Sequence, residues 1–284
     1  MGHEGQTGHR RHLTGLPDFM IIGAMKSGTT SLFNYLAVHP DLIPCEEKEP
    51  SFFAKRYDMG LDWYRSLYPE GEGLRFEGST DYTKHPTFTG VPARIHQAVP
   101  EAKLIFVVRH PIERLLSHLQ HNLAQGRLTM KRFSSPGFWE GNGRDYIYVS
   151  KYGMQIEEYL KWFPLDRFLF IRLEHMAEQP RDTLATVAEF LGIDDAPFDQ
   201  ADFKKYNEAQ EIVAPSNRYV SAARKALARL GLVDRRSAGH GRKLPRPELS
   251  SERVDLLWEE LSPDLERFEE ITGFRLDYFP HAEP

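Results

Sequence analysis

The sequence predicts an α/β fold in which a central parallel sheet carries helices on both of its faces, within a single domain. Two observations favour it: apolar runs of strand length alternate with runs of helical spacing, and the first strand feeds a Gly/Ser/Thr loop that opens onto a helix. The 284 residues, 40% of them hydrophobic, can bury a sizeable core, and no linker divides them. Ligands of such sheets bind beyond the carboxyl ends of the strands.

In the first half of the chain, strands and helices are expected in alternation. Residues 19–23 are apolar throughout, as in a strand covered on both faces, and a helix over residues 29–38 should end at His39 and Pro40. An irregular stretch over residues 41–48 is expected next. The remaining elements expected here are helices at 60–68, 92–99 and 111–125 and strands at 75–80 and 103–109.

The second half continues the same pattern after a glycine-rich and aromatic loop at residues 134–145. Apolar residues at helical spacing predict a helix from Tyr152 to Phe163, which Pro164 ends. The other expected elements are a strand at 168–173, a helix through Leu184 and Leu191 closed by Gly192, and a last helix spanning residues 254–268.

Composition excludes several classes of protein. A net charge of -5 argues against a general nucleic-acid binder, and the single cysteine, Cys45, excludes an internal disulfide. Neither a signal peptide nor a membrane-spanning run is apparent, so we expect a protein of the cytoplasm that does not associate with membranes. Residues 1–16 are expected to be a flexible tail, with the functional domain at residues 17–284. Nothing in the sequence indicates the oligomeric state.

The loop after the first strand has the features of a phosphate cradle. It reads Lys26-Ser27-Gly28-Thr29-Thr30-Ser31, so small residues let backbone N–H groups approach an anion and Lys26 adds a full positive charge. A nucleotide triphosphatase loop would carry its lysine directly after the second glycine, where this chain has Thr29. Glycine serving turn geometry alone is the alternative interpretation.

The pattern K-x-G-T-T resembles the 5′-phosphosulfate loop of sulfotransferases that use 3′-phosphoadenosine 5′-phosphosulfate (PAPS). Four further motifs match that family in the same order: K-E-P-S-F-F from Lys48, G-S-T-D-Y from Gly78, V-V-R-H-P-I-E-R-L-L-S from Val107, and G-H-G-R-K-L-P from Gly239. The pattern is most similar to the heparan-sulfate (N- and 3-O-) type and its bacterial relatives. The resemblance implies a P-loop-like sheet, PAPS as donor, adenosine 3′,5′-bisphosphate as product, and no metal.

The resemblance also implies a set of nucleotide-binding residues. Residues Lys26 to Ser31 would hold the 5′-phosphosulfate, Arg109 and Ser117 the 3′-phosphate, and Gly241 with Arg242 would form a loop that closes over the nucleotide. Tyr152 aligns with a family tyrosine near the nucleotide, although a tyrosine at the start of an amphipathic helix is also typical of a core. Arg114 has a weaker claim to bind the nucleotide, and it could equally be a surface cation paired with Glu113 or Asp81.

Two residues are the candidates for catalysis. Lys26 can neutralise charge growing on the leaving oxygen, and the resemblance places Glu49 beside the sulfate as general base, with Pro50, Phe52 and Phe53 partly shielding it from water. Asp81, Tyr82 and His85 are expected to line the acceptor pocket, with His85 the alternative base. Heparan-type relatives often carry a lysine after the position of Glu77, whereas this chain has Gly78, so Lys84 could take that role.

These motifs and residues predict a sulfotransferase that modifies a hydroxyl, or less readily an amine, of a carbohydrate or small metabolite. A nucleotide-kinase-like phosphoryl transferase is the alternative, although it would need lysine at Thr29 and an acid at Arg109. A non-catalytic nucleotide- or carbohydrate-binding protein is a third. The acceptor is not identified by any motif: residues 198–247 are expected to be a variable region, and the net acidity gives no support for a wide basic groove.

Overall fold

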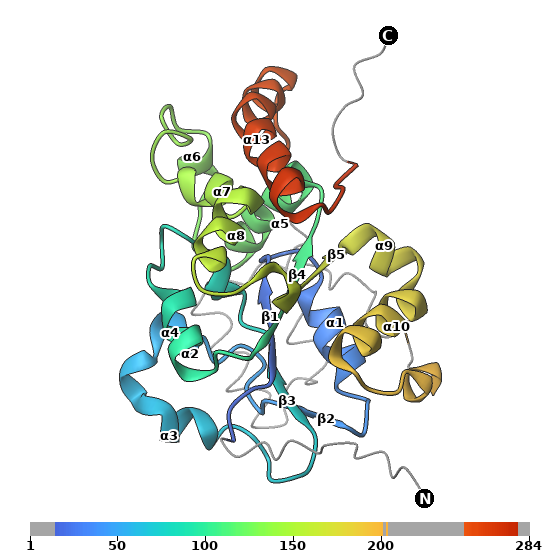
Figure 1. Cartoon of the computed structure of the whole chain (residues 1–284). Coiled ribbons are helices and arrows are strands. Elements are labelled where there is room, and N and C mark those ends of the chain that lie inside the picture. Colours follow the sequence, from blue (N-terminus) through green and yellow to red (C-terminus); the bar gives the residue numbers. More distant parts are fainter. Residues whose placement is uncertain (1–14, 201–202, 204–246, 278–284) are drawn as a thin grey trace, which may run out of the picture.

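A twisted parallel sheet forms the centre of the computed structural model, which describes residues 15–200, 203 and 247–277 (Figure 1). Within these residues the sheet has five strands in the order β2-β3-β1-β4-β5, and every neighbouring pair is parallel. The strands are β1 (Phe19–Gly23), β2 (Leu42–Pro44), β3 (Leu74–Glu77), β4 (Lys103–Val108) and β5 (Phe168–Arg172).

Helices cover both faces of this sheet (Figure 1). The α-helices are α1 (Thr29–Leu36), α2 (Phe52–Lys55), α3 (Gly60–Arg65), α4 (Val91–Ala98), α5 (Pro111–Ala124), α6 (Met130–Phe133), α7 (Arg144–Tyr148), α8 (Tyr152–Leu160), α9 (Leu173–Glu178), α10 (Pro180–Leu191) and α13 (Ser251–Thr272). Four short 3₁₀ helices lie among the described residues: η1 (Tyr57–Met59), η2 (Thr80–Thr83), η3 (Leu165–Arg167) and η4 (Ala196–Gln200).

The core is divided into two layers because successive side chains of a strand point to opposite faces. Phe19 and Ile21 pack with α1 and α10, whereas Met20 and Ile22 pack with α4, α5, α8 and α13. All five β1 residues are buried. The predicted single-domain α/β fold with a parallel sheet is therefore confirmed.

Three expectations about local structure were wrong. The stretch expected to be irregular contains the edge strand β2, whose three residues, ending in Pro44, are too few to show a period. The expected strand at 75–80 ends at Glu77, because Thr80 already starts the 3₁₀ turn η2. Leu16, expected in a flexible tail, is 4% exposed and belongs to the core.

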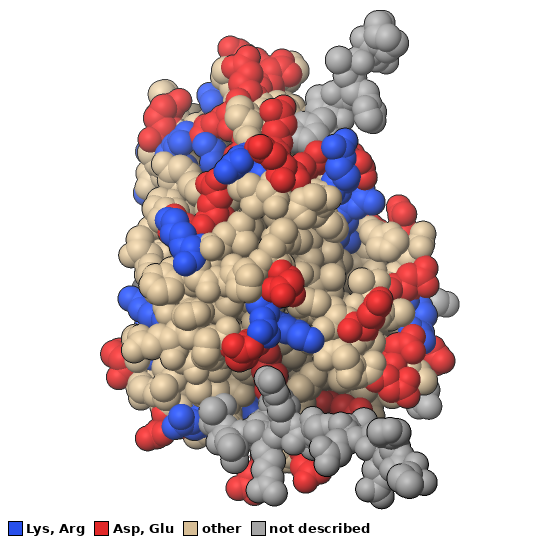
Figure 2. Space-filling model, in the orientation of Figure 1, with Lys and Arg blue, Asp and Glu red and all other residues tan. Residues whose placement is uncertain are grey.

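The carboxyl ends of β1, β3 and β4 meet at one edge of the sheet, because neighbouring parallel strands run in the same direction. That edge brings together the loop after Gly23, the turn after Glu77 and Arg109. No helix in the part of the chain that the structure describes is long and apolar enough to cross a bilayer. Figure 2 shows acidic and basic side chains mixed over one face, with Asp and Glu gathered over α13 at the top.

Candidate active site

The loop that joins β1 to α1, residues 24–28, turns the chain sharply at the edge of the sheet. Lys26 (φ 71°) and Gly28 (φ 83°) both adopt left-handed backbone conformations, and the Ser27 N–H donates to the Ala24 carbonyl at 3.1 Å. A Cβ at Gly28 would lie 2.4 Å from Leu173 Cδ1, and the backbone conformation there strains any other residue, so glycine is favoured beside α9. The helix α1 starts directly after this tight turn.

The start of α1 is suited to an anion. Gly28 is its N-cap, no side chain caps the helix by hydrogen bonding, and the first turn contains no acidic residue. The first N–H groups of a helix have no intrahelical acceptor, and the helix dipole adds partial positive charge there.

Ser27 supplies a second, independent sign of an anion site. Its side chain is 0% exposed, and its Oγ has no hydrogen-bond partner among the residues described. The nearby Tyr152 hydroxyl donates its proton to the Arg109 carbonyl at 2.6 Å rather than to Ser27. Burial raises the pKa of Tyr152 to about 12, and the Ser27 hydroxyl lowers it slightly. A buried hydroxyl left unpaired costs about 1–3 kcal/mol, so a ligand oxygen would find a ready partner there.

Three charged side chains surround the loop. Burial lowers the pKa of Lys26, the positive charge of Arg109 lowers it further, and the carboxylate of Glu49 acts in the opposite direction. Arg109 Nη1 donates to the Lys26 carbonyl at 3.4 Å. The other hydrogen bond of this guanidinium within the described chain runs from Nη2 to Glu113 Oε2 and is also 3.4 Å long. Lys26, Arg109 and Glu49 therefore share one electrostatic neighbourhood.

Glu49 lies beside this cluster on the chain that leads from β2 to α2. Lys48 Nζ donates to Glu49 Oε1 at 2.5 Å and Thr80 Oγ1 donates to Oε2 at 3.2 Å. The side chain is 39% exposed, whereas Phe52 and Phe53 are buried against Tyr64. The expected shielding of Glu49 by these phenylalanines was therefore wrong, because their rings turn into the core.

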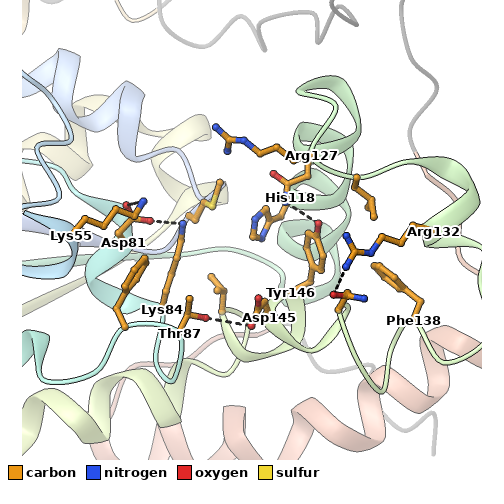
Figure 3. Close-up of a pocket in the computed structure, with 16 residues that line it drawn as sticks. Lys55, Asp81, Lys84, Thr87, His118, Arg127, Arg132, Phe138, Asp145 and Tyr146 are labelled. Atoms are coloured by element: carbon orange, nitrogen blue, oxygen red, sulfur yellow. Dashed lines mark hydrogen bonds and ion pairs between the residues drawn. The ribbon is translucent and has the colours of Figure 1, made fainter.

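A cavity of about 320 Å³ opens next to the β1–α1 loop, with Met25 in its lining (Figure 3). Four cations line it, against two acids, Asp81 and Asp145. We call it the basic cavity, after the four side chains Lys55, Lys84, Arg127 and Arg132. His118 adds no charge, because burial and the nearby Arg114 lower its pKa well below the ordinary range.

Asp81 organises one wall of the basic cavity. Its carboxylate accepts from Lys55 Nζ at 2.5 Å, Lys84 Nζ at 2.7 Å and Ser51 Oγ at 2.7 Å. Burial opposes its ionisation, but Lys84 and Lys55 outweigh that effect and lower the pKa of Asp81 to about 2. On the opposite rim, the Arg127 guanidinium has no ion pair or hydrogen bond within the described part of the chain.

Residues 16–225 match the family model described as a sulfotransferase domain. The chain belongs to the sulfotransferase family. It is 29% identical over 268 residues to human heparan sulfate glucosamine 3-O-sulfotransferase 6, covering 90% of this chain and 72% of that relative. It is 34% identical over 187 residues to human heparan sulfate glucosamine 3-O-sulfotransferase 3B1, covering 63% and 46%. The chain therefore spans less than half the length of this second relative.

A Caenorhabditis elegans bifunctional heparan sulfate N-deacetylase/N-sulfotransferase 1 is 27% identical over 198 residues, covering 65% of this chain and 23% of that relative. Among solved structures, a sulfotransferase from Alicyclobacillus acidocaldarius has a TM-score of 0.64 at 23% identity, covering 92% of this chain and 97% of that one. Mouse sulfotransferase SULT7A1 complexed with PAP has a TM-score of 0.50 at 16% identity, covering 89% of each chain. These two structures bear on the fold alone. The predicted family is confirmed, and a kinase is not favoured.

Several residues predicted for this sulfotransferase's site do not face it. Tyr82 is 2% exposed and its hydroxyl donates to the buried Glu77, so it lies in the core. His85 is tied through its backbone N–H and carbonyl to Gln155 and is not among the residues that line the basic cavity. Tyr152 differs from these two: although it is fully buried, its hydroxyl donates to the Arg109 carbonyl, beside the β1–α1 loop, and its place near the nucleotide stays a prediction.

The other residues predicted to bind the nucleotide lie on the expected helices or outside the described residues. Thr29, Thr30 and Ser31 form the first turn of α1, with Thr30 exposed. Ser117 is half-buried on α5. Gly241 and Arg242 fall outside the described residues, and their role stays a prediction. No group of three or more His, Cys, Asp or Glu within the described ranges is placed to hold a metal ion.

Relatives often carry a lysine at the position of Gly78, and in this chain the side chain of a different lysine, Lys48, fills the space beside Gly78. Lys48 Nζ donates to the Gly78 carbonyl at 3.4 Å, and a Cβ at Gly78 would lie 3.7 Å from Lys48 Cε. Lys84, the predicted substitute, is bound to Asp81 instead. In the sequence Lys48 is visible only as part of a motif, because its contact with Gly78 forms when two distant segments of the chain come together.

Glu77 is a buried carboxylate that the sequence did not single out. It is 0% exposed and accepts hydrogen bonds from Tyr64 Oη (2.6 Å), Tyr82 Oη (2.5 Å) and Ser79 Oγ. Burial raises the pKa of Glu77 to about 7, although these hydroxyl groups act in the other direction. Its position at the end of a strand was the sequence signal that could have identified Glu77 as buried. The hydroxyl groups that bind it come together only when the chain folds.

The raised pKa of Glu77 makes the stability of the fold depend on pH. Because the folded carboxyl holds its proton up to about pH 7 against an ordinary value of 4.5, its contribution is fully present below pH 4.5 and is lost as the pH rises through 7. Glu77→Gln should remove this effect. The unfolding free energy of the variant, relative to wild type, should rise by roughly 3 kcal/mol between pH 4.5 and 8.

Urea denaturation at a series of pH values measures this difference. Glu70→Gln, at an exposed position, is the matched control and should track the wild type throughout. A constant difference between Glu77→Gln and wild type across the range would contradict the assignment.

Proposed function

We propose that this sulfotransferase moves the sulfuryl group of PAPS to a hydroxyl group of a carbohydrate, with an amine as the less favoured acceptor. The observation that carries the proposal is the β1–α1 loop, where the buried, unpartnered Ser27 hydroxyl lies between Lys26 and an uncapped helix start. PAPS would supply an activated sulfuryl group with the nucleotide 5′-phosphate as its leaving group. The family match and the relatives' names support this donor.

The charges around the loop suit the two ends of this donor. Lys26 and the residues from Ser27 to Ser31 would hold the 5′-phosphosulfate, and Arg109 with Ser117 would hold the 3′-phosphate. Arg109 suits that role because its one carboxylate contact in the described chain, to Glu113, is 3.4 Å long. Gly241 and Arg242 would close over the nucleotide.

Glu49 is the proposed general base. Its carboxylate is near enough to raise the pKa of Lys26 against the effect of burial, so a proton acceptor and a cation lie near each other. Lys26 would stabilise the charge that develops on the leaving oxygen.

We place the acceptor in the basic cavity, beside Met25 of the same loop. The two relatives quoted first are named as acting on heparan sulfate, and the four cations around the cavity suit a sugar that bears a carboxylate or sulfate group. The chain's net charge of -5 had given no support for an anionic acceptor. The local excess of cations provides that support.

The donor can be tested before the acceptor is known. Calorimetric titration with adenosine 3′,5′-bisphosphate, beside ATP with Mg²⁺, should show binding of the bisphosphate alone. Preference for Mg²⁺-ATP would overturn the proposal in favour of a phosphoryl transferase.

Arg109→Ala should discriminate between two nucleotides. Because Arg109 is assigned to the 3′-phosphate, the variant should bind adenosine 3′,5′-bisphosphate at least tenfold more weakly, a loss of about 1.4 kcal/mol or more. Adenosine 5′-phosphosulfate, which lacks that phosphate, should lose much less. Equal losses for both ligands, measured by calorimetry, would refute the assignment.

Glu49→Gln should separate binding from turnover. The neutral amide cannot take the acceptor proton, so the rate should fall roughly 10²- to 10⁴-fold while bisphosphate affinity stays within about twofold. Glu46→Gln, three residues earlier and exposed, is the matched control and should retain activity. Transfer at the wild-type rate by Glu49→Gln would exclude this residue as the base.

Arg127→Ala should reveal the charge of the acceptor. Its exposed guanidinium is worth about 1 kcal/mol to an anionic partner, so KM for carboxylate-bearing oligosaccharides should rise roughly fivefold with little change in kcat. Neutral oligosaccharides should be unaffected, and Arg267→Ala, a distant exposed arginine, is the control. The same KM for charged and neutral acceptors in the variant would exclude an anionic contact here.

A further inference from the structure

Lys48 is held from several sides at the edge of the site. Its Nζ donates to Glu49 Oε1 at 2.5 Å and to the Gly78 carbonyl at 3.4 Å, and it lies 6.0 Å from the centre of the Phe33 ring on α1. Its backbone carbonyl accepts from the Gly78 N–H at 2.9 Å, so the segment before α2 is tied to the end of β3. Only 21% of the side chain is exposed, unlike a typical surface lysine.

Gly78 provides the room for this side chain. A Cβ built there would meet Phe33 Cδ2 at 3.5 Å, Ile21 Cβ at 3.7 Å and Lys48 Cε at 3.7 Å, all at ordinary contact distance. Gly78 is not among the glycines with positive φ, so the backbone itself does not demand glycine. A longer side chain at position 78 would project into the space that the Lys48 stem now fills.

The two carboxylate oxygens of Glu49 are held unequally. Oε1 is bound at 2.5 Å by an ammonium that is itself fixed by Gly78, whereas Oε2 has the longer, 3.2 Å bond from the neutral Thr80 hydroxyl. The charge-assisted contact therefore fixes the orientation of the carboxylate. Oε2 is the oxygen more easily freed for another proton donor.

We propose that Lys48 is a positioning residue that fixes Oε1 of Glu49, so that Oε2 receives the acceptor proton. This inference rests on the proposed function. In the transfer, the proton of the acceptor hydroxyl passes to Oε2 as the acceptor oxygen forms its bond to sulfur. The bond from sulfur to the nucleotide phosphate oxygen breaks at the same time, and its electron pair stays on that oxygen.

Lys48→Met tests the inference because it removes the charge and retains an unbranched stem. Loss of orientation should lower kcat between roughly tenfold and a hundredfold, with bisphosphate affinity unchanged. KM for the acceptor should stay within about twofold, because Lys48 is not assigned to substrate binding. A merely structural role of Lys48 would instead lower the bisphosphate affinity together with kcat.

The chain offers a rescue and a control. Lys48→Met combined with Gly78→Lys places an ammonium on the other wall of the same space, and it should restore at least part of kcat. Lys161→Met breaks a more exposed Lys–Glu pair of the same length, 2.5 Å to Glu158, and should leave kcat unchanged.

The outcomes separate the two proposals. If wild-type protein binds no bisphosphate and transfers no sulfuryl group, the proposed function fails. If wild type transfers and Lys48→Met has the same kcat, the positioning role is overturned while the function stands. A fall in kcat that Gly78→Lys does not rescue, or that comes with an equal loss of bisphosphate affinity, would likewise overturn the role.

Discussion

A fully buried guanidinium, that of Arg114, holds the β1–α1 loop in place. Arg114 is 0% exposed, and it donates to Ser150 Oγ at 2.7 Å, to the Met25 carbonyl at 3.3 Å and to the Tyr146 carbonyl. Burial lowers its pKa to about 10, which still leaves it charged at neutral pH. No carboxylate among the residues described binds it, so these oxygens replace its water, and the loop, α5 and α7 are joined through one charge.

This arrangement concentrates positive charge around one turn of an acidic chain. The charge of Arg109 lowers the pKa of both Lys26 and Arg114, which means that Arg109 repels each of these two cations. Their mutual repulsion is relieved by an anion placed among them, and the protein needs little reorganisation to receive it because the cations are already fixed. The unpartnered Ser27 hydroxyl lies in the same turn. In the proposed function, these charges, which the fold has already assembled, would favour the binding of a phosphosulfate group.

Features written in consecutive residues could be predicted from the sequence, and features assembled from distant segments could not. Four of the five strands and the β1–α1 loop are continuous patterns, so the fold and Lys26 were accessible to inspection. The alternative that Arg114 is a surface cation was wrong, since nothing local in the sequence distinguishes a buried arginine from an exposed one. The four cations of the basic cavity come from separate parts of the chain, so no motif contains them. The cytoplasmic location stays a prediction.

In the proposed function, two consecutive residues of the β1–α1 loop lie beside two different anionic ligands. The Met25 side chain lines the basic cavity, while Lys26, the next residue, belongs to the donor cluster with Arg109 and Glu49. Two anions brought this close repel each other strongly in a partly buried site, so cations are needed on both sides of the loop. The net charge of -5 hides this, because the acidic residues gather elsewhere, as over α13 (Figure 2). Local placement of charge, rather than its total, therefore decides which molecules can meet here.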